Sequence, residues 1–318
     1  MLKFLSALYC SIIQIRNLLY DLGLFKIYHT APLVISVGNI EVGGTGKTPF
    51  TVTLAKKLKK RGYSVAILTR GYKGRLRGTH LVLPEHLAED VGDESLLMAR
   101  TSSIHVVKSP DRVAGARFAH KELGTQIVIM DDGFQHRRIY RDLDIVLVAG
   151  NVQTDAPLPM GSLREPVTSL KRANFIIYTK DSPQQSGLRA ELVPKGLVDA
   201  RGNRHDLEII KGKKVLAVCG LARPKSFFFT LERLGAEVEP LALRDHHQYT
   251  DKNIQTIEQI ASNKDLIITT QKDMVKLVAD SLDKRWLALE VTMQVPQIDT
   301  IIKEIETIAE NRRIPRQG

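Results

Sequence analysis

Three observations predict an α/β protein with a mostly parallel sheet, helices on both faces, and a second, smaller α/β domain. Short apolar runs alternate with longer amphipathic stretches, which is typical of strands joined by crossover helices. The alternation weakens between about residues 181 and 213 and then resumes. At 318 residues the chain is long enough for two domains that each bury a core.

The first half of the chain carries the clearer pattern. Helices are expected where apolar periodicity follows a start signal such as Pro110 and stops at a glycine such as Gly62 or Gly124. The expected strands are 31–38, 63–70, 104–109, 126–130, 143–150 and 173–180, and the expected helices are 47–62, 91–102 and 110–124.

The second half resumes the alternation after a stretch rich in Ser, Gln, Gly, Arg and Pro, which we interpret as a connector. Its apolar and helical segments are 214–220, 223–235, 237–245, 250–262, 265–270, 271–280 and 285–291, with a final helix over 297–313. The pattern predicts a core domain over 29–182, a connector over 183–212 and a smaller α/β domain over 213–318.

The composition narrows the classes of partner. A formal charge of +11 suits an anionic membrane surface or a phosphorylated substrate. Nucleic acid is not expected, because basic and aromatic residues are not interleaved as in single-strand binders. With only Cys10 and Cys219, a disulfide framework or a cysteine-based zinc site is not expected, which fits a reducing compartment.

The N-terminal segment 1–28 begins with an apolar but interrupted helix, "MLKFLSALYCSIIQIRNLLYDLGLF". Its uninterrupted apolar part is shorter than the roughly 20 residues that span a bilayer, and no small-x-small cleavage site follows. Two interpretations stay open: an amphipathic helix on a membrane surface with Arg16 near lipid phosphate, or a helix docked on the protein's own core. The residues expected in the membrane are Leu2, Leu5, Tyr9, Ile12, Ile13 and Leu19.

The stretch "SVGNIEVGGTGKTPF" almost matches the phosphate-binding loop (P-loop) of nucleotide-using proteins. The strict pattern has a glycine where Glu41 stands. The required order is nevertheless present, with a strand, a glycine-rich turn and a helix start near Lys47. We therefore interpret it as a P-loop with a different entry path, whose nucleotide-binding residues are Gly43, Gly44, Thr45, Gly46, Lys47 and Thr48.

Two features of this loop point to ATP and Mg²⁺. Lys47 is expected to reach the β- and γ-phosphates, and the Thr48 hydroxyl to hold Mg²⁺. A second strand ends at Asp131 and Asp132, where ligands bind in open α/β sheets. One of these two acids is expected to serve the metal and the other a water or a substrate hydroxyl.

Several residues could act on a phosphoryl acceptor or on the transferred group. The candidates for a general base are Asp93, Glu94, Asp132 and the acids and histidines of "RDHH" at 244–247. For Asp93, which stands just before a predicted helix, the role of a helix N-cap is an alternative. The cations in loops or at helix starts are Lys73, Arg75, Arg77, Arg112, Arg137, Arg138 and Arg164.

Taken in chain order, the motifs resemble a known family. They are "GNIEVGGTGKTP", "RGYKG", "GDE", "DDGFQH", "LREP", "GLARPKSFF", "DHH" and "TTQKDMVK". With the apolar first helix, they resemble the tetraacyldisaccharide 4'-kinases of lipid A synthesis over nearly the whole chain. The pair "GGTGKTP" and "DDGFQH" is specific, and the departure at Glu41 is shared with that family.

The resemblance implies an ATP- and Mg²⁺-dependent kinase that phosphorylates the 4'-hydroxyl of a tetraacyldisaccharide 1-phosphate. Residues 29–182 would then be its P-loop kinase core. The family works at the cytoplasmic face of the inner membrane, so the first helix would contact the membrane surface as a peripheral anchor. We further expect a monomer.

The resemblance also implies roles for individual residues. Lys47 and Thr48 match the phosphate loop, and Asp131 and Asp132 match the Mg²⁺-side acids. Asp93 matches the proposed general base and His246 its orienting partner, although the adjacent His247 and, as a base, Asp132 stay alternatives. Arg112 and the pair Arg164–Glu165 match motif positions near phosphate and metal, with Glu165 on the metal side.

Two other classes of function remain as alternatives. A P-loop GTPase or ATPase switch is one, but the guanine-reading Asn/Thr-Lys-x-Asp motif lacks its spacer at Lys272-Asp273. A soluble small-molecule kinase or ligase of the same fold is the other, and it needs no apolar leader. Deleting residues 1–24 would distinguish the second alternative from a lipid kinase. An enzyme with a soluble substrate should keep its turnover, whereas a lipid kinase should lose much of it.

Overall fold

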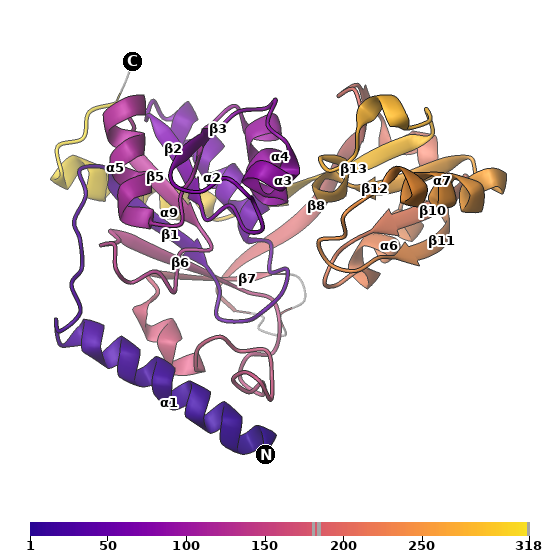
Figure 1. Cartoon of the computed structure of the whole chain (residues 1–318). Coiled ribbons are helices and arrows are strands. Elements are labelled where there is room, and N and C mark those ends of the chain that lie inside the picture. The colour runs from indigo at the N-terminus through magenta and orange to yellow at the C-terminus, as the bar shows by residue number, and fades with distance from the viewer. Residues whose placement is uncertain (180–181, 183–185, 317–318) are drawn as a thin grey trace.

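One ladder of hydrogen-bonded strands runs through both halves of the chain (Figure 1). The structure is a computed structural model that describes residues 1–179, 182 and 186–316. In spatial order, the first half contributes β7 (Phe175–Thr179), β6 (Leu143–Val148), β1 (Leu33–Gly38), β5 (Ile127–Asp131), β2 (Val65–Thr69), β4 (His105–Lys108) and β3 (His80–Val82). All neighbours in this half are parallel except β3 and β4.

The second half continues the ladder beyond β7. In spatial order, its strands are β8 (Leu188–Asp199), β13 (Trp286–Gln294), β12 (Leu266–Thr270), β10 (Lys214–Cys219) and β11 (Glu237–Ala242), with β9 (Arg204–His205) beside β8. The pairs of β10 with β11 and β12, and of β12 with β13, are parallel. Parallel strands align their carboxyl ends, which is where both halves carry their polar motifs.

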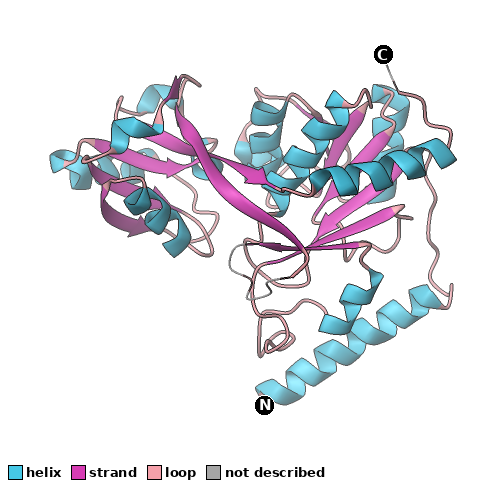
Figure 2. Cartoon of the chain, turned by 180° about the vertical axis from the view of Figure 1, so that it is seen from behind, coloured by secondary structure: helices cyan, strands magenta, loops and turns pink. Residues whose placement is uncertain are grey.

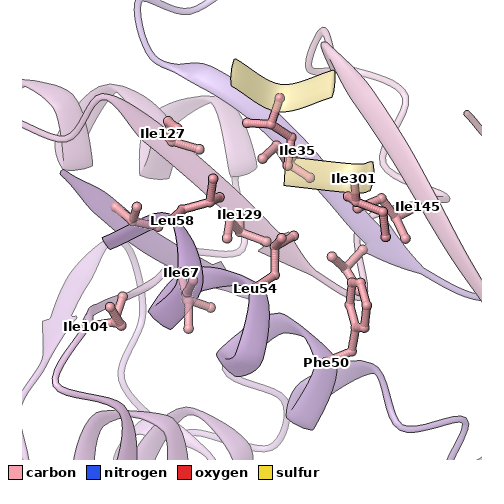
Figure 3. Packing of buried hydrophobic residues seen from close by; sticks show 14 of the residues in the cluster. Ile35, Phe50, Leu54, Leu58, Ile67, Ile104, Ile127, Ile129, Ile145 and Ile301 are labelled. Carbon is pink, nitrogen blue, oxygen red and sulfur yellow. The ribbon is translucent and has the colours of Figure 1, made fainter. Parts of the chain in front are cut away.

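Helices cover both faces of the first half because alternate strand residues are apolar on both sides. On one face, α2 (Lys47–Lys60), α4 (Asp93–Ser102) and α9 (Ile298–Asn311) surround a core that contains Ile35, Ile129 and Phe50 (Figure 3). On the other face, α5 (Arg112–Leu123) packs on β2, β4 and β5, and η1 (Val167–Arg172) packs on β6. The short α3 (Ala88–Val91) precedes α4.

The second half repeats the arrangement on a smaller scale. Phe227 and Leu231 of α6 (Lys225–Arg233) pack on one face, while Ile254 and Ile257 of α7 (Asp251–Ile260) pack on the other. The single-turn α8 (Gln271–Met274) follows β12 directly. The remaining short helices are η2 (Leu207–Ile210), η3 (Ala261–Asn263) and η4 (Ala279–Ser281).

Two long strands join the halves (Figure 2). β8 pairs with β7 through its first residues and with β13 over most of its length, with a bulge between Glu290 and Val291 of β13. Much of the predicted connector is therefore one long strand. Residue 180, at the end of a predicted strand, and residue 183, at the start of the predicted connector, lie outside the described residues.

The position of α9 also differs from the predicted division of the chain. This helix was expected with the second domain, yet Ile298, Ile301, Ile302 and Ile305 are buried in the core of the first half. The physical reason is the apolar stripe of α9 at i, i+3, i+4 and i+7, which is stable only when it is buried. Because β13 returns the chain from the second half to the first, this stripe packs against α2. The domain boundaries themselves stay a prediction.

The helix α1 (Leu2–Asp21) lies apart from the sheet at one edge of the molecule (Figure 1). One side docks on the protein, where the Tyr9 hydroxyl donates to the Arg164 carbonyl at 2.9 Å and the Arg16 guanidinium to the Gln135 carbonyl. The expected placement of Tyr9 in lipid and of Arg16 at lipid phosphate is therefore wrong. The opposite side is an exposed apolar row made of Leu5, Leu8, Ile12, Ile15 and Leu18.

Among residues 1–179, 182 and 186–316, no helix is both long and apolar enough to cross a bilayer.

The packing of α9 gives a first testable prediction. Ile302→Ala removes a fully buried side chain and should lower the free energy of unfolding by about 2–5 kcal/mol. Ile260→Ala at the exposed end of α7 is the matched control and should change it by less than about 1 kcal/mol. Urea unfolding of both variants measures the difference, and equal values would contradict the placement of α9 in the first core.

Candidate active site

The P-loop joins β1 to α2 at the carboxyl edge of the sheet. Gly43 and Gly46 adopt φ values of 115° and 85°, which other residues rarely tolerate. A Cβ on Gly46 would also lie only 2.5 Å from the terminal methyl group of Met293 in β13. Gly46 is the N-cap of the 14-residue α2, so the free amides of that helix face the loop and suit an anion.

Glu41 is buried at the entry of the loop and points away from the helix N-terminus. Its Oε1 accepts hydrogen bonds from the backbone amides of Ala149 at 2.7 Å and Gly150 at 3.3 Å. Its Oε2 lies 3.3 Å from the Arg223 guanidinium, which comes from the second half. The residue that departs from the strict P-loop pattern thus connects the loop to the end of β6 and to the opposite half.

Asp132 forms ion pairs with two cations of the site, Lys47 and Arg164. Lys47 Nζ lies 3.4 Å from Oδ1 of Asp132, and Arg164 Nη1 donates to both carboxylate oxygens at 3.0 Å. Burial alone would raise the pKa of Asp132, but the charges of Lys47 and Arg164 outweigh it and lower the pKa below its usual range. Asp132 is therefore an anion that Lys47 and Arg164 hold near the phosphate loop.

Asp131 has the opposite electrostatic environment. It is buried, and it accepts hydrogen bonds from the hydroxyls of Thr48 at 2.9 Å and Thr51 at 3.1 Å. Burial, reinforced by the charges of Glu94 and Asp132, raises the pKa of Asp131 to about 7 despite the nearby Lys47. A raised pKa means that the carboxyl favours its protonated form. A divalent cation bound beside it would favour the ionised form.

The donor set at this point suits Mg²⁺. Thr48 and Asp131 offer hard oxygen ligands side by side at the start of α2. The described residues contain no group of three or more His, Cys, Asp or Glu side chains that could hold a metal on their own. Proteins commonly bind Mg²⁺ through one or two protein ligands, with substrate phosphates and water completing the coordination, and these residues fit that arrangement.

The structure does not bring Glu165 to this group, although the sequence placed it on the metal side. Its buried carboxylate lies 2.5 Å from the Arg172 guanidinium and accepts a hydrogen bond from Asn17 of α1 at 2.9 Å. A buried carboxylate needs such partners, and Arg172 and Asn17 provide them to Oε2, while Oε1 of Glu165 is buried without a partner in the described structure. Of the predicted pair, only Arg164 reaches the acids.

Arg112 lies beside the two acids at the start of α5. It is buried, its guanidinium donates to the Ser109 carbonyl, and burial lowers its pKa to about 10 while the charges of Asp132 and Asp131 oppose that change. It remains a cation at neutral pH. Its Nε is buried without a partner in the described structure, so it retains an unused donor.

A second acidic residue, Asp93, meets a histidine from the other half of the chain. Asp93 is the first residue of α4 and makes no capping bond, so the alternative role of a helix N-cap is wrong. Instead its Oδ2 lies 3.1 Å from Nδ1 of His246. Glu94, the next residue of α4, is close enough to raise the pKa of Asp131, so the start of α4 lies near the acids of the P-loop.

The partners of His246 define its tautomer. Lys272 Nζ lies 3.3 Å from Nε2 of His246, and an ammonium has no acceptor, so Nε2 accepts. Nδ1 then carries the proton and donates a hydrogen bond to Oδ2 of Asp93. His247 does not take this place, because its ring packs edge-on against Tyr249 at 5.0 Å.

The pair keeps Asp93 ionised. Burial raises the pKa of the Asp93 carboxyl, but the hydrogen bond from His246 and the charge of Lys276 together lower it below its usual range. Lys276 Nζ lies 3.8 Å from Oδ2 of Asp93. Asp93 is thus an anion, buried and oriented, that can accept a proton.

Sequence reasoning missed several residues of this site. Thr51, Arg223, Lys272 and Lys276 all contact predicted site residues but were assigned no role. The lysines stand four apart in "QKDMVK", directly after the carboxyl end of β12, and this spacing was a usable signal.

Comparisons with known proteins identify a family that this chain resembles over nearly its whole length. A family profile described as LpxK, Tetraacyldisaccharide-1-P 4'-kinase, matches residues 1–308. Relatives named Tetraacyldisaccharide 4'-kinase include one from Koribacter versatilis, 35% identical over 97% of this chain and 99% of its own. Another, from Halothermothrix orenii, is 34% identical over 97% of this chain and 90% of its own.

A solved structure matches as well. It is described as a crystal structure of the "apo" form of LpxK from Aquifex aeolicus in complex with ATP. It is 34% identical and has a TM-score of 0.82, over 96% of this chain and 97% of that chain. The predicted fold class, a P-loop, mostly parallel α/β sheet with a second α/β part, is confirmed.

Asp131 gives a prediction about pH. Its pKa of about 7 in the folded state exceeds the ordinary value of 3.8, so its contribution to stability is complete below about pH 4 and is lost as the pH rises through about 7. Without Mg²⁺, Asp131→Asn should therefore raise the free energy of unfolding at pH 8 by up to about 4 kcal/mol.

Denaturant unfolding in the presence of a chelator, at several pH values from 4.5 to 8, measures this effect. The advantage of Asp131→Asn should shrink as the pH falls, whereas Asp280→Asn, a substitution in η4, should behave like wild type throughout. A constant difference between Asp131→Asn and wild type would show that Asp131 does not titrate in this range.

Proposed function

The chain belongs to the Tetraacyldisaccharide-1-P 4'-kinase family, and from that membership we propose how its own residues perform the reaction. It is an ATP-dependent kinase of lipid A biosynthesis, which transfers the γ-phosphate of ATP to the 4'-hydroxyl of a tetraacyldisaccharide 1-phosphate. The predicted activity is confirmed at the level of the family. The roles of single residues are our proposal.

One observation supports these roles above the others. The pair of Asp93 and His246 is assembled from two halves of the chain, and Glu94, next to Asp93 in α4, lies close enough to Asp131 to raise its pKa. A phosphate loop alone would fit any P-loop protein. An oriented, ionised carboxylate opposite the loop fits transfer to a hydroxyl.

We assign the binding of ATP to the loop and its cations. The amides at 43–48 and the ammonium of Lys47 bind the β- and γ-phosphates. Thr48 and Asp131 would hold Mg²⁺, which neutralises charge on those phosphates when bound. Arg164 and Arg112 supply positive charge beside the transferred group, where it stabilises the charge that develops.

Asp93 is then the general base. Its carboxylate accepts the proton of the 4'-hydroxyl as the new O–P bond forms and the bond between the γ-phosphorus and the bridging oxygen of ADP breaks. His246 orients Asp93 and does not itself contact the nucleotide in this assignment. Asp132 is already paired with Lys47 and Arg164, so it is the weaker candidate for the base.

The exposed row of α1 supports contact with the membrane that carries the substrate. Leu5, Leu8, Ile12, Ile15 and Leu18 form one apolar side of a helix whose other side is docked. We propose that this row lies in the surface of the inner membrane, on the cytoplasmic face where ATP is available. We also propose that the protein acts as a monomer, since one chain supplies Lys47, Asp93 and His246.

Transfer of labelled γ-phosphate to a tetraacylated disaccharide 1-phosphate in detergent micelles tests the assigned residues. Lys47→Ala and Asp93→Asn should each lower kcat/KM roughly a hundredfold or more, about 2.7 kcal/mol of lost transition-state stabilisation. Lys57→Ala, an exposed lysine on the same helix as Lys47, is the control and should keep wild-type turnover. Wild type that binds ATP but yields no lipid product would refute the substrate.

Sedimentation with anionic phospholipid vesicles tests the membrane row. Ile12→Glu with Ile15→Glu places two charges on the exposed side of α1 and should lower vesicle binding at least about tenfold, because a charge on that side must leave the lipid. Ile260→Glu, on the exposed side of α7, is the control and should bind like wild type. Equal binding of all three proteins would show that α1 is not the contact.

A further inference from the structure

Two lysines of the second half converge on the pair of Asp93 and His246. Lys272 lies in α8 and contacts His246 at 3.3 Å and Glu94 at 3.3 Å. Lys276, four residues later, points at Asp93 with Nζ 3.8 Å from Oδ2. Their side chains differ in exposure, since Lys276 is 2% exposed and Lys272 is 17% exposed.

Lys276 has little freedom to move. Its ammonium lies 2.7 Å from Oδ1 of Asp273 and donates to the His247 carbonyl at 3.0 Å. Asp273 is fully buried and is itself fixed by the Gly220 amide at 3.0 Å and the Thr270 hydroxyl at 2.7 Å. The charge that faces Asp93 is therefore held in place by the second half.

Both contacts of Asp93 fall on one oxygen. His246 and Lys276 approach Oδ2, while no residue in the described parts of the chain donates a hydrogen bond to Oδ1. A carboxylate held by one oxygen presents the other in a fixed direction. Oδ1 is thus the oxygen that can receive the proton of a hydroxyl.

We propose that Lys276 is a positioning residue for phosphoryl transfer, which holds Oδ2 of Asp93 together with His246 and so directs Oδ1 toward the 4'-hydroxyl. The inference rests on the proposed role of Asp93 as the base. Lys276 does not contact substrate in this assignment and acts only through Asp93. Its position in the second half means that the base is complete only when both halves are in register.

The charged groups around Asp93 determine how the replacement of Lys276 would change the pH dependence of kcat/KM. From the second half these are His246, Lys276 and Lys272, with Asp245 beside His246, and from α4 it is Glu94. Lys276 is the nearest fixed cation, and its charge lowers the pKa of Asp93 against the effect of burial. Replacing it should raise that pKa, and with it the acidic limb of kcat/KM.

The competing explanation is that Lys276 only balances the buried charge of Asp273. A double variant, Lys276→Met with Asp273→Asn, removes both charges and so tests the two explanations apart. Lys276→Gln, which keeps a donor for Asp273 and the His247 carbonyl, provides a second uncharged variant in case the first does not fold. Lys264→Met removes a lysine that pairs with Glu239 elsewhere in the second half and is the control.

The experiment measures kcat and KM for ATP and lipid between pH 3 and 9, because the pKa of Asp93 lies below its usual range in wild type, with ATP affinity as the check of folding. In the uncharged variants that bind ATP normally, kcat should fall about 10- to 100-fold and the acidic limb should move up by about one pH unit. Lys276→Arg, which keeps the charge, should recover most of the turnover. Wild-type kcat and an unmoved limb in either folded variant would overturn the proposal.

Asp93→Asn in the same assay separates this inference from the proposed function. If Asp93→Asn keeps its turnover, the assigned base is wrong and Lys276 has nothing to position. If Asp93→Asn is inactive while the Lys276 variants match wild type, the base stands and only the role of Lys276 fails.

Discussion

The antiparallel pair of β8 and β13 is the connection on which the site depends. Asp93 lies in the first half and His246 in the second, 153 positions later, so their contact exists only if the two halves are held at a fixed offset. β13 also brings Met293 against Gly46 of the phosphate loop, and it continues into α9, which is buried in the first core. The second half is thus joined to the first through both β8 and β13. The hydrogen bonds between these backbone strands, rather than any side-chain contact, fix the position of Asp93 relative to His246.

Adjacent acids in this site are given different properties by their surroundings. Asp131 points into the protein toward two threonine hydroxyls, and burial raises its pKa, whereas Asp132, with φ of 55°, turns out toward Lys47 and Arg164, which lower its pKa. Two neighbouring carboxylates cannot both be ionised cheaply unless cations are supplied. The protein supplies two cations to Asp132 and the hydroxyls of Thr48 and Thr51 to Asp131, whose pKa stays raised by burial.

Sequence reasoning succeeded where the chemistry is contiguous and stopped where it is assembled by tertiary structure. The phosphate loop and the paired acids could be predicted because a strand, a glycine turn and a helix start follow one another within a few residues. The partner of Asp93 came only from a family resemblance, and Lys276, Lys272 and Arg223 were missed because their targets lie far away in the chain. The contacts of Glu165 with Arg172 and with Asn17 of α1 were missed for a related reason, since neither is visible in a local motif, and its metal-side role stays a prediction. The face of α1 was partly misjudged because an apolar helix can be covered by protein on one side and exposed on the other.

Glu41 illustrates why a motif should be interpreted through its backbone. A glycine is required where the loop adopts positive φ, and in this chain those positions are Gly43 and Gly46, while Glu41 is not among them. The side chain at 41 is therefore free to serve another purpose, and its carboxylate is directed away from the phosphates into the amides at the end of β6 and the guanidinium of Arg223. Because Arg223 belongs to the second half, the outer side of the loop is tied to the same body that supplies His246 and Lys276. A rotation that separates the halves would break the Arg223–Glu41 pair together with the Asp93–His246 contact.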